Sequence, residues 1–342
     1  MANTININNR RYLGNKYRLL PFIKGVVESE CDNIRTFFDI FAGTGAVASA
    51  FRDRTVITND ILYSSYICSL AWFSPAGYDS VKLERIIDGY NALSVTAGNY
   101  MTDNFSDTYF SRADCAKIGH VREDIENRFL SGEVTERERA LLITSLLYAM
   151  DRIAKTCGHY DAYRRGAEFD RHLEMALPSA AQDNDSGNRC YNTDSNELAR
   201  RVSADLVYMD PPYNSRQYCD AYHLLENVAR WNKPEVFGVA GKMDRAALKS
   251  RYCTKEAASA FEDLVAHLNC RYILLSYNNM AEKGNDRSNA KIGDGDILRI
   301  LSSRGEVKVF SEDYRAFTAG LSDRTDNRER LFLCKCEGGM PV

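Results

Sequence analysis

The sequence has few of the patterns that build metal sites or disulfide frameworks. Its ten cysteines are scattered without a Cys-x-x-Cys pair, and the two that lie closest together are Cys334 and Cys336. The five histidines stand in no recognisable catalytic pattern. The sequence therefore supports neither a zinc site nor a disulfide framework, and no metal is expected. Reduced thiols of a cytoplasmic protein are the simplest interpretation.

Long apolar runs are also missing. No stretch reaches 18 apolar residues, and the first twelve residues, MANTININNRRY, are polar and contain no signal-peptide core. We therefore expect neither a membrane span nor an export signal. The formal net charge of −3 disfavours a protein that coats nucleic acid. It leaves room for a local basic face, because phosphate contacts need clustered Lys and Arg rather than a basic total.

The order of apolar segments predicts an α/β fold. The apolar residues 37–41 lead into a small-residue turn and a helix-compatible stretch, and residues 55–60 form a second strand pattern. Strand, glycine turn, helix and strand make a βαβ unit, which implies a parallel sheet. A helical pattern then runs to about residue 178, and within it Thr135 and Glu138 form a capping box for a helix that we expect to end near Gly158. Strand patterns return at residues 204–210, 271–279, 306–312 and 329–336.

The 342 residues are enough for one large domain with a sizeable insertion. The pattern thus predicts a parallel sheet interrupted by a mostly helical insertion.

A glycine-rich turn follows the first expected strand. Residues 43–48, GTGAVA, match G-x-G-x-x-A, and Asp60 comes 17 residues after Gly43. Such glycines let the backbone approach a nucleoside, and an acid at the end of the next strand can hold ribose hydroxyls. NAD and S-adenosylmethionine sites share this arrangement, so the turn alone leaves both open. Phe41 before the turn, and the absence of a hydride-transfer partner, favour a methyltransferase.

A second motif ends an apolar run near the middle of the chain. Residues 206–209 are followed by Asp210, Pro211, Pro212 and Tyr213. Proline fixes its own φ and drives the residue before it towards extended geometry, so a buried strand stops at Asp210. This leaves a carboxylate, a carbonyl and an aromatic ring at the carboxyl end of a strand, where open α/β sheets bind ligands. The alternative is that the prolines only end the strand and Tyr213 packs nearby.

Three segments carry a resemblance to a known family: RRYLGNKYRLLPFI (residues 10–23), DIFAGTGAVA (39–48) and DPPY (210–213). In this order they resemble the N6-adenine-specific DNA methyltransferases of the Dam-like, alpha-ordered group, and most closely the modification enzymes of type IIS restriction systems. The resemblance implies a Rossmann-like, S-adenosylmethionine-dependent methyltransferase sheet with a helical target-recognition insertion. It implies residues 1–65 and 186–342 as the catalytic domain and 66–185 as the insertion.

The resemblance also implies partners and a setting. The cofactor would be S-adenosyl-L-methionine and the substrate double-stranded DNA, methylated at a specific sequence by an adenine-specific enzyme that flips its target base. A companion restriction endonuclease and a bacterial or phage-type cytoplasm would complete a restriction-modification system.

The family's site residues can be carried over to this sequence one by one. The implied catalytic residues are Asp210, Pro211, Pro212 and Tyr213. The implied cofactor-binding residues are Tyr12, Gly14, Asn15, Lys16, Asp39, Phe41, Ala42, Gly43, Thr44, Gly45, Asp60, Ile61, Asp194 and Asp210. Lys16 as a surface lysine and Asp194 as a loop cap are the alternatives for two of them.

A basic stretch follows the DPPY motif and contains one acid, Asp244. The expected DNA-binding residues in it are Lys242, Arg245, Lys249, Arg251 and Lys255. A solvated helix face explains such a stretch equally well.

Other functions remain open at this stage. They are an RNA methyltransferase, a methyltransferase for the cytosine amine, and a catalytically idle DNA-binding relative. A dehydrogenase would leave the DPPY and YLGNK segments unexplained.

Overall fold

The structure is a computed structural model that describes residues 5–10, 12–278, 291–313 and 328–337. Within these residues, seven strands form one sheet in the order β3-β2-β1-β4-β5-β7-β6. The strands are β1 (Thr36–Asp39), β2 (Thr55–Asn59), β3 (Arg189–Tyr191), β4 (Ser203–Met209), β5 (Asn269–Asn278), β6 (Gly305–Asp313) and β7 (Arg328–Cys336).

The direction of the strands decides which residues meet at one edge of the sheet. The strands from β3 to β5 pair in parallel, whereas β7 runs antiparallel to both β5 and β6. The carboxyl ends of the parallel strands therefore share an edge with the beginning of β7. Asp60 and Asp210, which follow β2 and β4, both lie at this edge.

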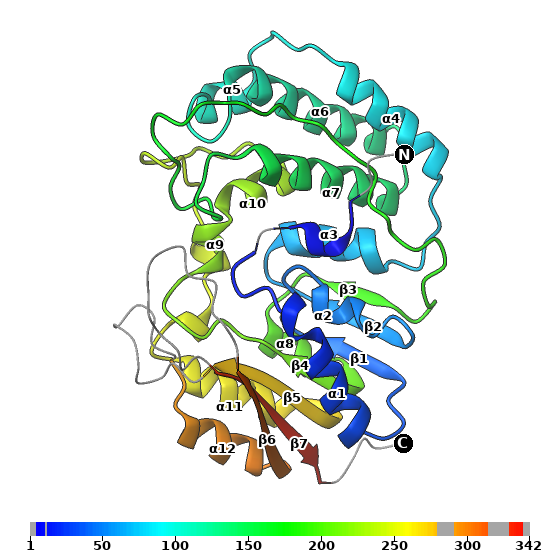
Figure 1. The fold of residues 1–342 in the computed structure, drawn as a ribbon, viewed down its shortest axis with the longest axis vertical. Helices are drawn as coiled ribbons and strands as arrows, with labels where there is room; N and C mark the ends of the chain where they lie inside the picture. The colour runs from blue at the N-terminus through cyan, green and yellow to red at the C-terminus, as the bar shows by residue number, and fades with distance from the viewer. Residues whose placement is uncertain (1–4, 11, 279–290, 314–327, 338–342) are drawn as a thin grey trace.

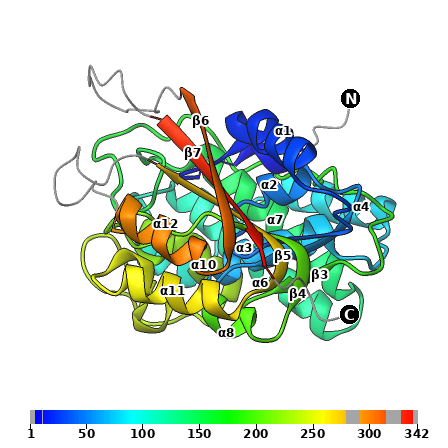
Figure 2. The same cartoon turned by 90° about the horizontal axis from the view of Figure 1, so that it is seen from below.

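Helices cover both faces of the sheet. On one face lie α1 (Leu20–Glu30), α2 (Ala46–Ser49) and α3 (Tyr63–Phe73), and on the other lie α8 (Ser195–Ala199), α11 (Ala257–His267) and α12 (Asp294–Ser302). Figure 2 shows α1 and α2 on one side of the strands and α8 and α11 on the other. The alternation of side chains along β1 explains the two cores, because Phe37 packs with the α1 side and Phe38 with the α11 side.

A second layer of helices packs on α3, away from the sheet (Figure 1). It contains α4 (Ser80–Ala92), α5 (Tyr100–Phe105), α6 (Arg112–Leu130), α7 (Glu136–Ile153) and α10 (His223–Arg230), and the short helix α9 (Tyr218–Ala221) leads into α10. Short 3-10 helices are formed by Ile7–Asn9, Tyr17–Leu19, Ala246–Leu248 and Arg251–Cys253. Residues 66–185 supply α4 to α7, while α9 and α10 come from the segment that follows β4.

The helix α7 lies at the centre of this layer. Its N-terminus is closed by the expected capping box, in which Thr135 and Glu138 each bond the other's backbone N–H. Residues 140–150 are all buried, as their apolar pattern predicts. The expected end at Gly158 is wrong, since α7 ends at Ile153. The backbone N–H of Lys155 donates instead to the carbonyl of Tyr109 at 3.0 Å, so a tertiary contact ends the helix early.

The expected Rossmann-like α/β class is confirmed. The strands expected in the later part of the chain are present as β4 to β7, and Asn279 of one expected segment lies outside the described residues. The short edge strand β3 was not expected, because three residues carry too little pattern. No described helix is long and apolar enough to cross a membrane. The described residues also contain no group of three or more His, Cys, Asp or Glu side chains that could hold a metal ion.

Candidate active site

A cavity lies at the carboxyl edge of the sheet, between the glycine turn and the DPPY segment. It has an empty volume of about 1010 Å³ including its open mouth. The sequence-predicted residues that line it are Tyr12, Gly14, Asn15, Lys16, Asp39, Phe41, Ala42, Gly43, Thr44, Asp60, Ile61, Asp194, Asp210, Pro212, Lys249 and Arg251.

The glycine turn follows β1 and brings bare backbone to the cavity. Gly43 and Gly45 have φ angles of 53° and 78°, which favour glycine. A side chain at Gly43 would meet the ring of Tyr12 at 3.1 Å, and one at Gly45 would meet the ring of Phe73 at 2.9 Å. The turn is therefore closed from two sides. Gly43 faces the cavity, and Gly45 holds the turn against α3.

Asp60 follows β2 and holds the glycine turn through backbone donors. Its two carboxylate oxygens accept from the N–H of Gly43 at 2.9 Å and from the N–H of Leu62 at 2.8 Å. Burial raises the pKa of Asp60 to about 6, although the two backbone hydrogen bonds act in the opposite direction. A carboxylate retains further lone pairs, so Asp60 can also accept from a ligand in the cavity.

Two buried polar residues stand beside this turn. Asn59 donates to the carbonyls of Ile40 and Thr193, both at 3.2 Å, and so ties the ends of β1 and β2 to the loop after β3. Asp39, at the end of β1, has a buried Oδ1 with no hydrogen-bond partner in the described part of the chain. Burial raises its pKa well above the usual range. Asp39 Oδ1 thus has unused capacity at the cavity wall.

The N-terminal loop covers the glycine turn and is held by two tyrosines that follow the DPPY segment. The ring of Tyr12 stacks on that of Tyr222, with 4.5 Å between centroids and 5° between planes. The N–H of Leu13 donates to the hydroxyl of Tyr222 at 2.6 Å, and the hydroxyl of Tyr218 donates to the carbonyl of Leu13 at 3.2 Å. One peptide segment therefore links the covering loop to the chain that follows Asp210.

Lys16 is not a surface lysine. It is buried, with a 6% exposed side chain, and its Nζ lies 3.2 Å from Oδ1 of Asp210. Burial alone would lower the pKa of Lys16, but the carboxylates of Asp210 and Glu329 outweigh it and raise this pKa well above the usual range. Burial also raises the pKa of Asp210 to about 6, against the effect of Lys16.

The DPPY residues divide between the cavity and its support. Asp210 and Pro212 line the cavity, Pro211 is buried, and Tyr213 is half-buried beside it. The Tyr213 ring meets Tyr277 edge to face at a centroid distance of 6.3 Å, and its carbonyl accepts from the N–H of Lys291 at 2.8 Å. This tyrosine therefore belongs to the rim next to Asp210, held on one side by Tyr277.

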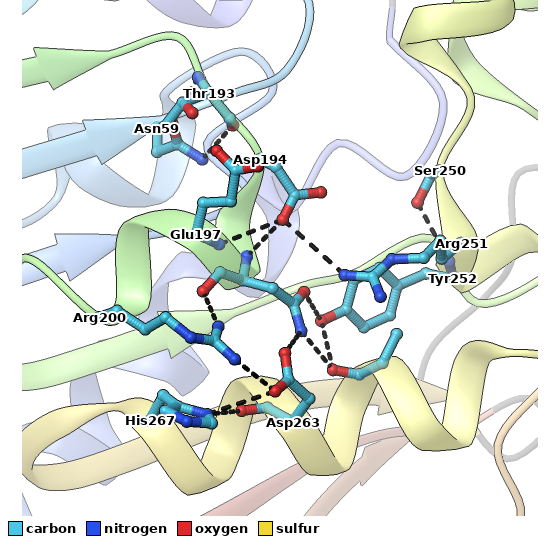
Figure 3. A network of polar contacts seen from close by, with 12 residues as sticks. Asn59, Thr193, Asp194, Glu197, Arg200, Ser250, Arg251, Tyr252, Asp263 and His267 are labelled. Atoms are coloured by element: carbon cyan, nitrogen blue, oxygen red, sulfur yellow. Dashed lines mark hydrogen bonds and ion pairs between the residues drawn. The ribbon is translucent and has the colours of Figure 1, made fainter.

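Asp194 combines the two readings that the sequence left open, since it both caps a helix and lines the cavity. Its Oδ1 accepts from the N–H groups of Asn196 at 2.8 Å and Glu197 at 3.2 Å at the start of α8. Figure 3 shows Asp194 facing Arg251, with 4.0 Å between the charged atoms. Beside them, the hydroxyl of Tyr252 donates to Oδ1 of Asn196 at 3.0 Å.

The basic stretch after the DPPY segment is only partly available to a partner. Lys242 pairs with Asp161 at 2.8 Å and Arg245 with Asp220 at 2.6 Å. Lys249 and Arg251 line the cavity. Neither Lys249 nor Lys255 makes an ion pair with the described residues. The expected cluster therefore divides in three: Lys242 and Arg245 are paired closely with aspartates, Arg251 lies in the cavity wall at 4.0 Å from Asp194, and Lys249 and Lys255 have no ion pair with the described residues.

Several lining residues were missed from the sequence. Gln217 immediately precedes α9, and Tyr218 is the first residue of this helix. Tyr252 packs edge to face on Phe41 at a centroid distance of 5.2 Å. Glu329 reaches the site from β7. The closely spaced tyrosines 213, 218 and 222 were a usable signal for the α9 side. Nothing in the local sequence marks Tyr252 or Glu329.

The comparisons with known proteins agree with this geometry. A family model described as D12 class N6 adenine-specific DNA methyltransferase matches residues 12–287, which is more than half of the chain. The chain belongs to this family. The match extends from the covering loop at Tyr12, through the glycine turn and the helical layer, to beyond the DPPY segment.

Similar proteins include two modification methylases and a type II methyltransferase. The chain is 36% identical to modification methylase StsI of Streptococcus sanguinis and 31% identical to modification methylase LlaI of Lactococcus lactis subsp. lactis. Each of these matches covers 94% of this chain but only 51% and 53% of the relative. The chain thus spans about half the length of these curated relatives. It is also 29% identical to type II methyltransferase M.NlaIII of Neisseria lactamica, over 93% of this chain and 94% of the relative.

Proposed function

We propose that this D12-class protein transfers a methyl group from S-adenosyl-L-methionine to the exocyclic N6 amine of an adenine in a specific double-stranded DNA sequence. The observation that carries the proposal is the shared cavity. A glycine turn with a ribose-competent acid, Asp60, occupies one end of it, and Asp210 and Pro212 occupy the other. A cofactor and a flat ring can therefore meet between them.

The residues present fit S-adenosylmethionine. Asp60 is the acceptor for the ribose hydroxyls, and Asp39 offers an unpartnered buried oxygen to a cationic amine. Phe41 and Tyr252 form an apolar wall, and Asp194 stands next to it as the acceptor for an adenine amine. When bound, the cofactor supplies an electrophilic methyl group on a sulfonium sulfur. The assignments of Tyr12, Asn15 and Ile61 as further cofactor contacts belong to the same proposal.

The target base must leave the duplex before it can reach Asp210, because N6 is inaccessible inside the stack. The N6 lone pair is delocalised into the ring, which makes the amine a poor nucleophile. Asp210 and the carbonyl of Pro211 can each accept one of its two protons, which draws the nitrogen towards sp³ geometry and frees the lone pair. Proline at both following positions keeps the turn stiff, so that both acceptors are preorganised.

Charge and atoms balance in one displacement step. The amine nitrogen would bond to the methyl group that the cofactor supplies, and the electron pair of the broken carbon–sulfur bond would leave with the sulfur. Nitrogen then carries one proton too many, and the proton passes to Asp210 and on to solvent. A pKa of about 6 lets Asp210 be ionised at neutral pH and still accept a proton transiently. No cysteine nucleophile is required.

Tyr213 is proposed to stack on the flipped base, at the rim beside Asp210. Base–aromatic stacking contributes about 1–3 kcal/mol per base. The edge-to-face contact with Tyr277 fixes the ring from one side and so reduces the entropy lost on stacking.

The rest of the chain is proposed to bind the duplex. Residues 66–185, the helical insertion, are the proposed target-recognition region, and residues 1–65 and 186–342 the catalytic domain. Lys249, Arg251 and Lys255 are the proposed phosphate contacts near the flipped base. Lys242 and Arg245 contribute less in this proposal, because each is already paired with an aspartate.

The family and its relatives also support a proposal for the cellular role. We propose a protective methylase of a restriction-modification system, which works in the cytoplasm beside a companion restriction endonuclease. The names of the relatives, two modification methylases and a type II methyltransferase, support this proposal.

The test is methyl transfer from labelled S-adenosylmethionine to unmethylated genomic DNA, followed by nucleoside analysis and mapping of the modified positions. N6-methyladenine at one recurring short sequence is the expected result. Label in N4-methylcytosine or in RNA would show that the substrate is different and that the chemistry of methyl transfer to an amine still holds. Cofactor binding without transfer to any nucleic acid would leave a catalytically idle DNA-binding relative.

A further inference from the structure

A buried lysine stands between two carboxylates at the active-site edge of the sheet. Nζ of Lys16 lies 3.2 Å from Oδ1 of Asp210 and 3.3 Å from Oε1 of Glu329. The exposed fractions of the three side chains are 6%, 19% and 12%. The pairing depends on the fold, because β7 is antiparallel to β5, and its first residues therefore lie at the sheet edge where the parallel strands β5 and β4 end. We call these three residues the Asp210–Lys16–Glu329 triad.

Glu329 reaches the reaction only through Lys16. Lys16 and Asp210 line the cavity, whereas Glu329 stands behind them. Its second oxygen, Oε2, is buried and has no hydrogen-bond partner among the residues that the structure describes. A buried carboxylate with half of its acceptors unused is costly unless it is paired, so Lys16 is the contact that holds Glu329 in the site.

The triad carries one negative charge more than an Asp210–Lys16 pair would. Burial raises the pKa of Asp210 to about 6, Lys16 lowers it, and Glu329 raises it. Other groups that interact with Asp210 are Asp39 from β1, Tyr208 from β4 and Tyr218 from α9. Because Lys16 lowers the pKa of Asp210 and Glu329 raises it, removal of one should shift this pKa in the opposite direction to removal of the other.

Asp210 has two requirements that conflict. It needs a nearby positive charge to stay ionised in a buried site, and it needs acceptor capacity for the adenine amine. A lysine bound to Asp210 alone would satisfy the first and compete with the amine for the second. A lysine shared with Glu329 satisfies both, because its charge stays within reach while Glu329 takes part of its hydrogen bonding.

We propose that Glu329 is a positioning residue for methyl transfer: its ion pair with Lys16 draws the ammonium group partly off Asp210, so that this carboxylate can accept the hydrogen bond of the adenine amine. The proposal rests on the proposed function and adds to it a residue that sits one contact behind the cavity.

The experiment compares Glu329→Gln, Lys16→Met and the double variant by the pH profile of kcat/KM for DNA methylation. Glu329→Gln should move the acid limb about one pH unit down, because Asp210 then faces Lys16 alone. Its plateau kcat should fall roughly tenfold, because Lys16 then competes with the amine. Lys16→Met should move the limb up, since two carboxylates remain together. The double variant should lie between them.

Asp294→Asn is the matched control. Asp294 pairs with Arg330, the residue after Glu329 in β7, and it stays outside the cavity. Its acid limb should match that of the unmodified protein. A Glu329→Gln variant that melts at a lower temperature and loses activity equally at every pH would show a purely structural role. Shifts of the two single variants in the same direction would also overturn the proposal.

A carboxyl-carbon NMR titration of Asp210 in the same variants separates this proposal from the proposed function. Opposite shifts of the Asp210 pKa, together with DNA methylation by the unmodified protein, are expected. Absence of methylation in the unmodified protein would overturn the proposed function. Methylation with an Asp210 titration that neither variant moves would overturn the role of Glu329 alone.

Discussion

Two aspartates at the same edge of the sheet are held in different ways. Asp60 and Asp210 follow β2 and β4, the two neighbours of β1, and burial raises the pKa of each to about 6. The partners of Asp60 are two backbone N–H groups, whereas Asp210 meets the Nζ of a long lysine side chain. Backbone donors are fixed by the fold, and a lysine has many rotamers.

The difference matches what each end of the cavity has to do. A cofactor that is exchanged after each turnover needs the same ribose site every time, so a carboxylate fixed by the glycine turn suits it. A base that arrives from the duplex must displace or share a contact, so a carboxylate held by a movable side chain suits the catalytic end. We expect changes at Asp60 to affect cofactor affinity, and changes at Asp210 to affect the transfer step.

The largest expected effect is that of Asp210→Ala. Methyl transfer should fall by at least about 100-fold, the scale on which a preorganised transition-state contact acts. DNA affinity and cofactor affinity should change little. Single-turnover transfer and two separate binding titrations measure the three quantities.

Asp205→Asn is a useful control for Asp210→Ala, because Asp205 lies in the same strand at the opposite end. It accepts from the N–H groups of Arg35 and Thr36, both at 2.9 Å, and so ties β4 to the chain that enters β1. This variant should lower the melting temperature and retain methyl transfer at temperatures where it stays folded. Near-normal turnover in Asp210→Ala would refute the mechanism.

The second effect concerns Asp60→Ala, which removes the acceptor of two backbone N–H groups and of the ribose hydroxyls. Hydrogen bonds to a charged group contribute about 1.5–3 kcal/mol, so the Kd of S-adenosylmethionine should rise roughly 10- to 100-fold. The rate of transfer at saturating cofactor should fall much less. Calorimetric titration gives the Kd, with the exposed Asp53→Asn as a control outside the cavity. An equal loss of cofactor affinity and of the transfer rate would contradict the proposal that Asp60 serves cofactor binding and Asp210 the transfer step.

Tyr213→Ala should act on the base side alone. The KM for DNA should rise about tenfold, within the range expected for lost base–aromatic stacking. The cofactor Kd should stay close to that of the unmodified protein. Tyr277→Phe removes a hydroxyl but keeps the ring that supports Tyr213, and it should have the smaller effect. Equal weakening of DNA and cofactor binding by Tyr213→Ala would contradict the assignment.

Acid should weaken cofactor binding through Asp60. Its folded-state pKa is raised to about 6, so the carboxyl is ionised above that pH and protonated below it. Only the ionised form accepts from both backbone donors and from ribose hydroxyls, so the Kd should be constant above pH 7. It should then rise by up to about tenfold per pH unit below 6. A Kd that stays flat between pH 5 and 7 would show that Asp60 does not bind the cofactor.

The same pKa shifts oppose folding at neutral pH. Between about pH 4 and 6 the folded Asp60 and Asp210 hold protons that the unfolded chain has released, so these groups make unfolding easier as the pH rises through that window. Above about pH 7 their contribution is constant. At neutral pH, the two ionised carboxylates in this buried site therefore lower the stability of the folded protein.

The sequence was informative wherever one residue type is required by local geometry. Gly43, Asp60 and Asp210 follow strands that the apolar pattern predicts, and the parallel order of those strands brings their ends together. Contacts that depend on tertiary packing could not be predicted from the sequence. Glu329 lies more than 300 residues from Lys16, and it meets this lysine because β7 inserts antiparallel beside β5. No local pattern records that arrangement.

The basic stretch shows the same limit. Five basic residues close together in the sequence suggest one basic surface. In the structure, however, Lys242 and Arg245 form ion pairs with aspartates from other segments. Asp161 comes from the loop after α7 and Asp220 from α9, and neither is close to these cations in sequence. Charge patterning alone could not separate the paired residues from the available ones.

The smallest expected effect tests that separation. Neutralising Lys249, Arg251 and Lys255 together, each as Met, should flatten the slope of log affinity for DNA against log salt by about 2–3, since each phosphate contact contributes about 0.9. The matched variant Lys242→Met should leave the slope nearly unchanged, because the charge of Lys242 is already paired with Asp161. Affinity measured at five salt concentrations between low and physiological ionic strength decides the matter. An unchanged slope in the triple variant would show that Lys249, Arg251 and Lys255 do not contact phosphate, and a lower slope in Lys242→Met would show that its ion pair opens to bind phosphate.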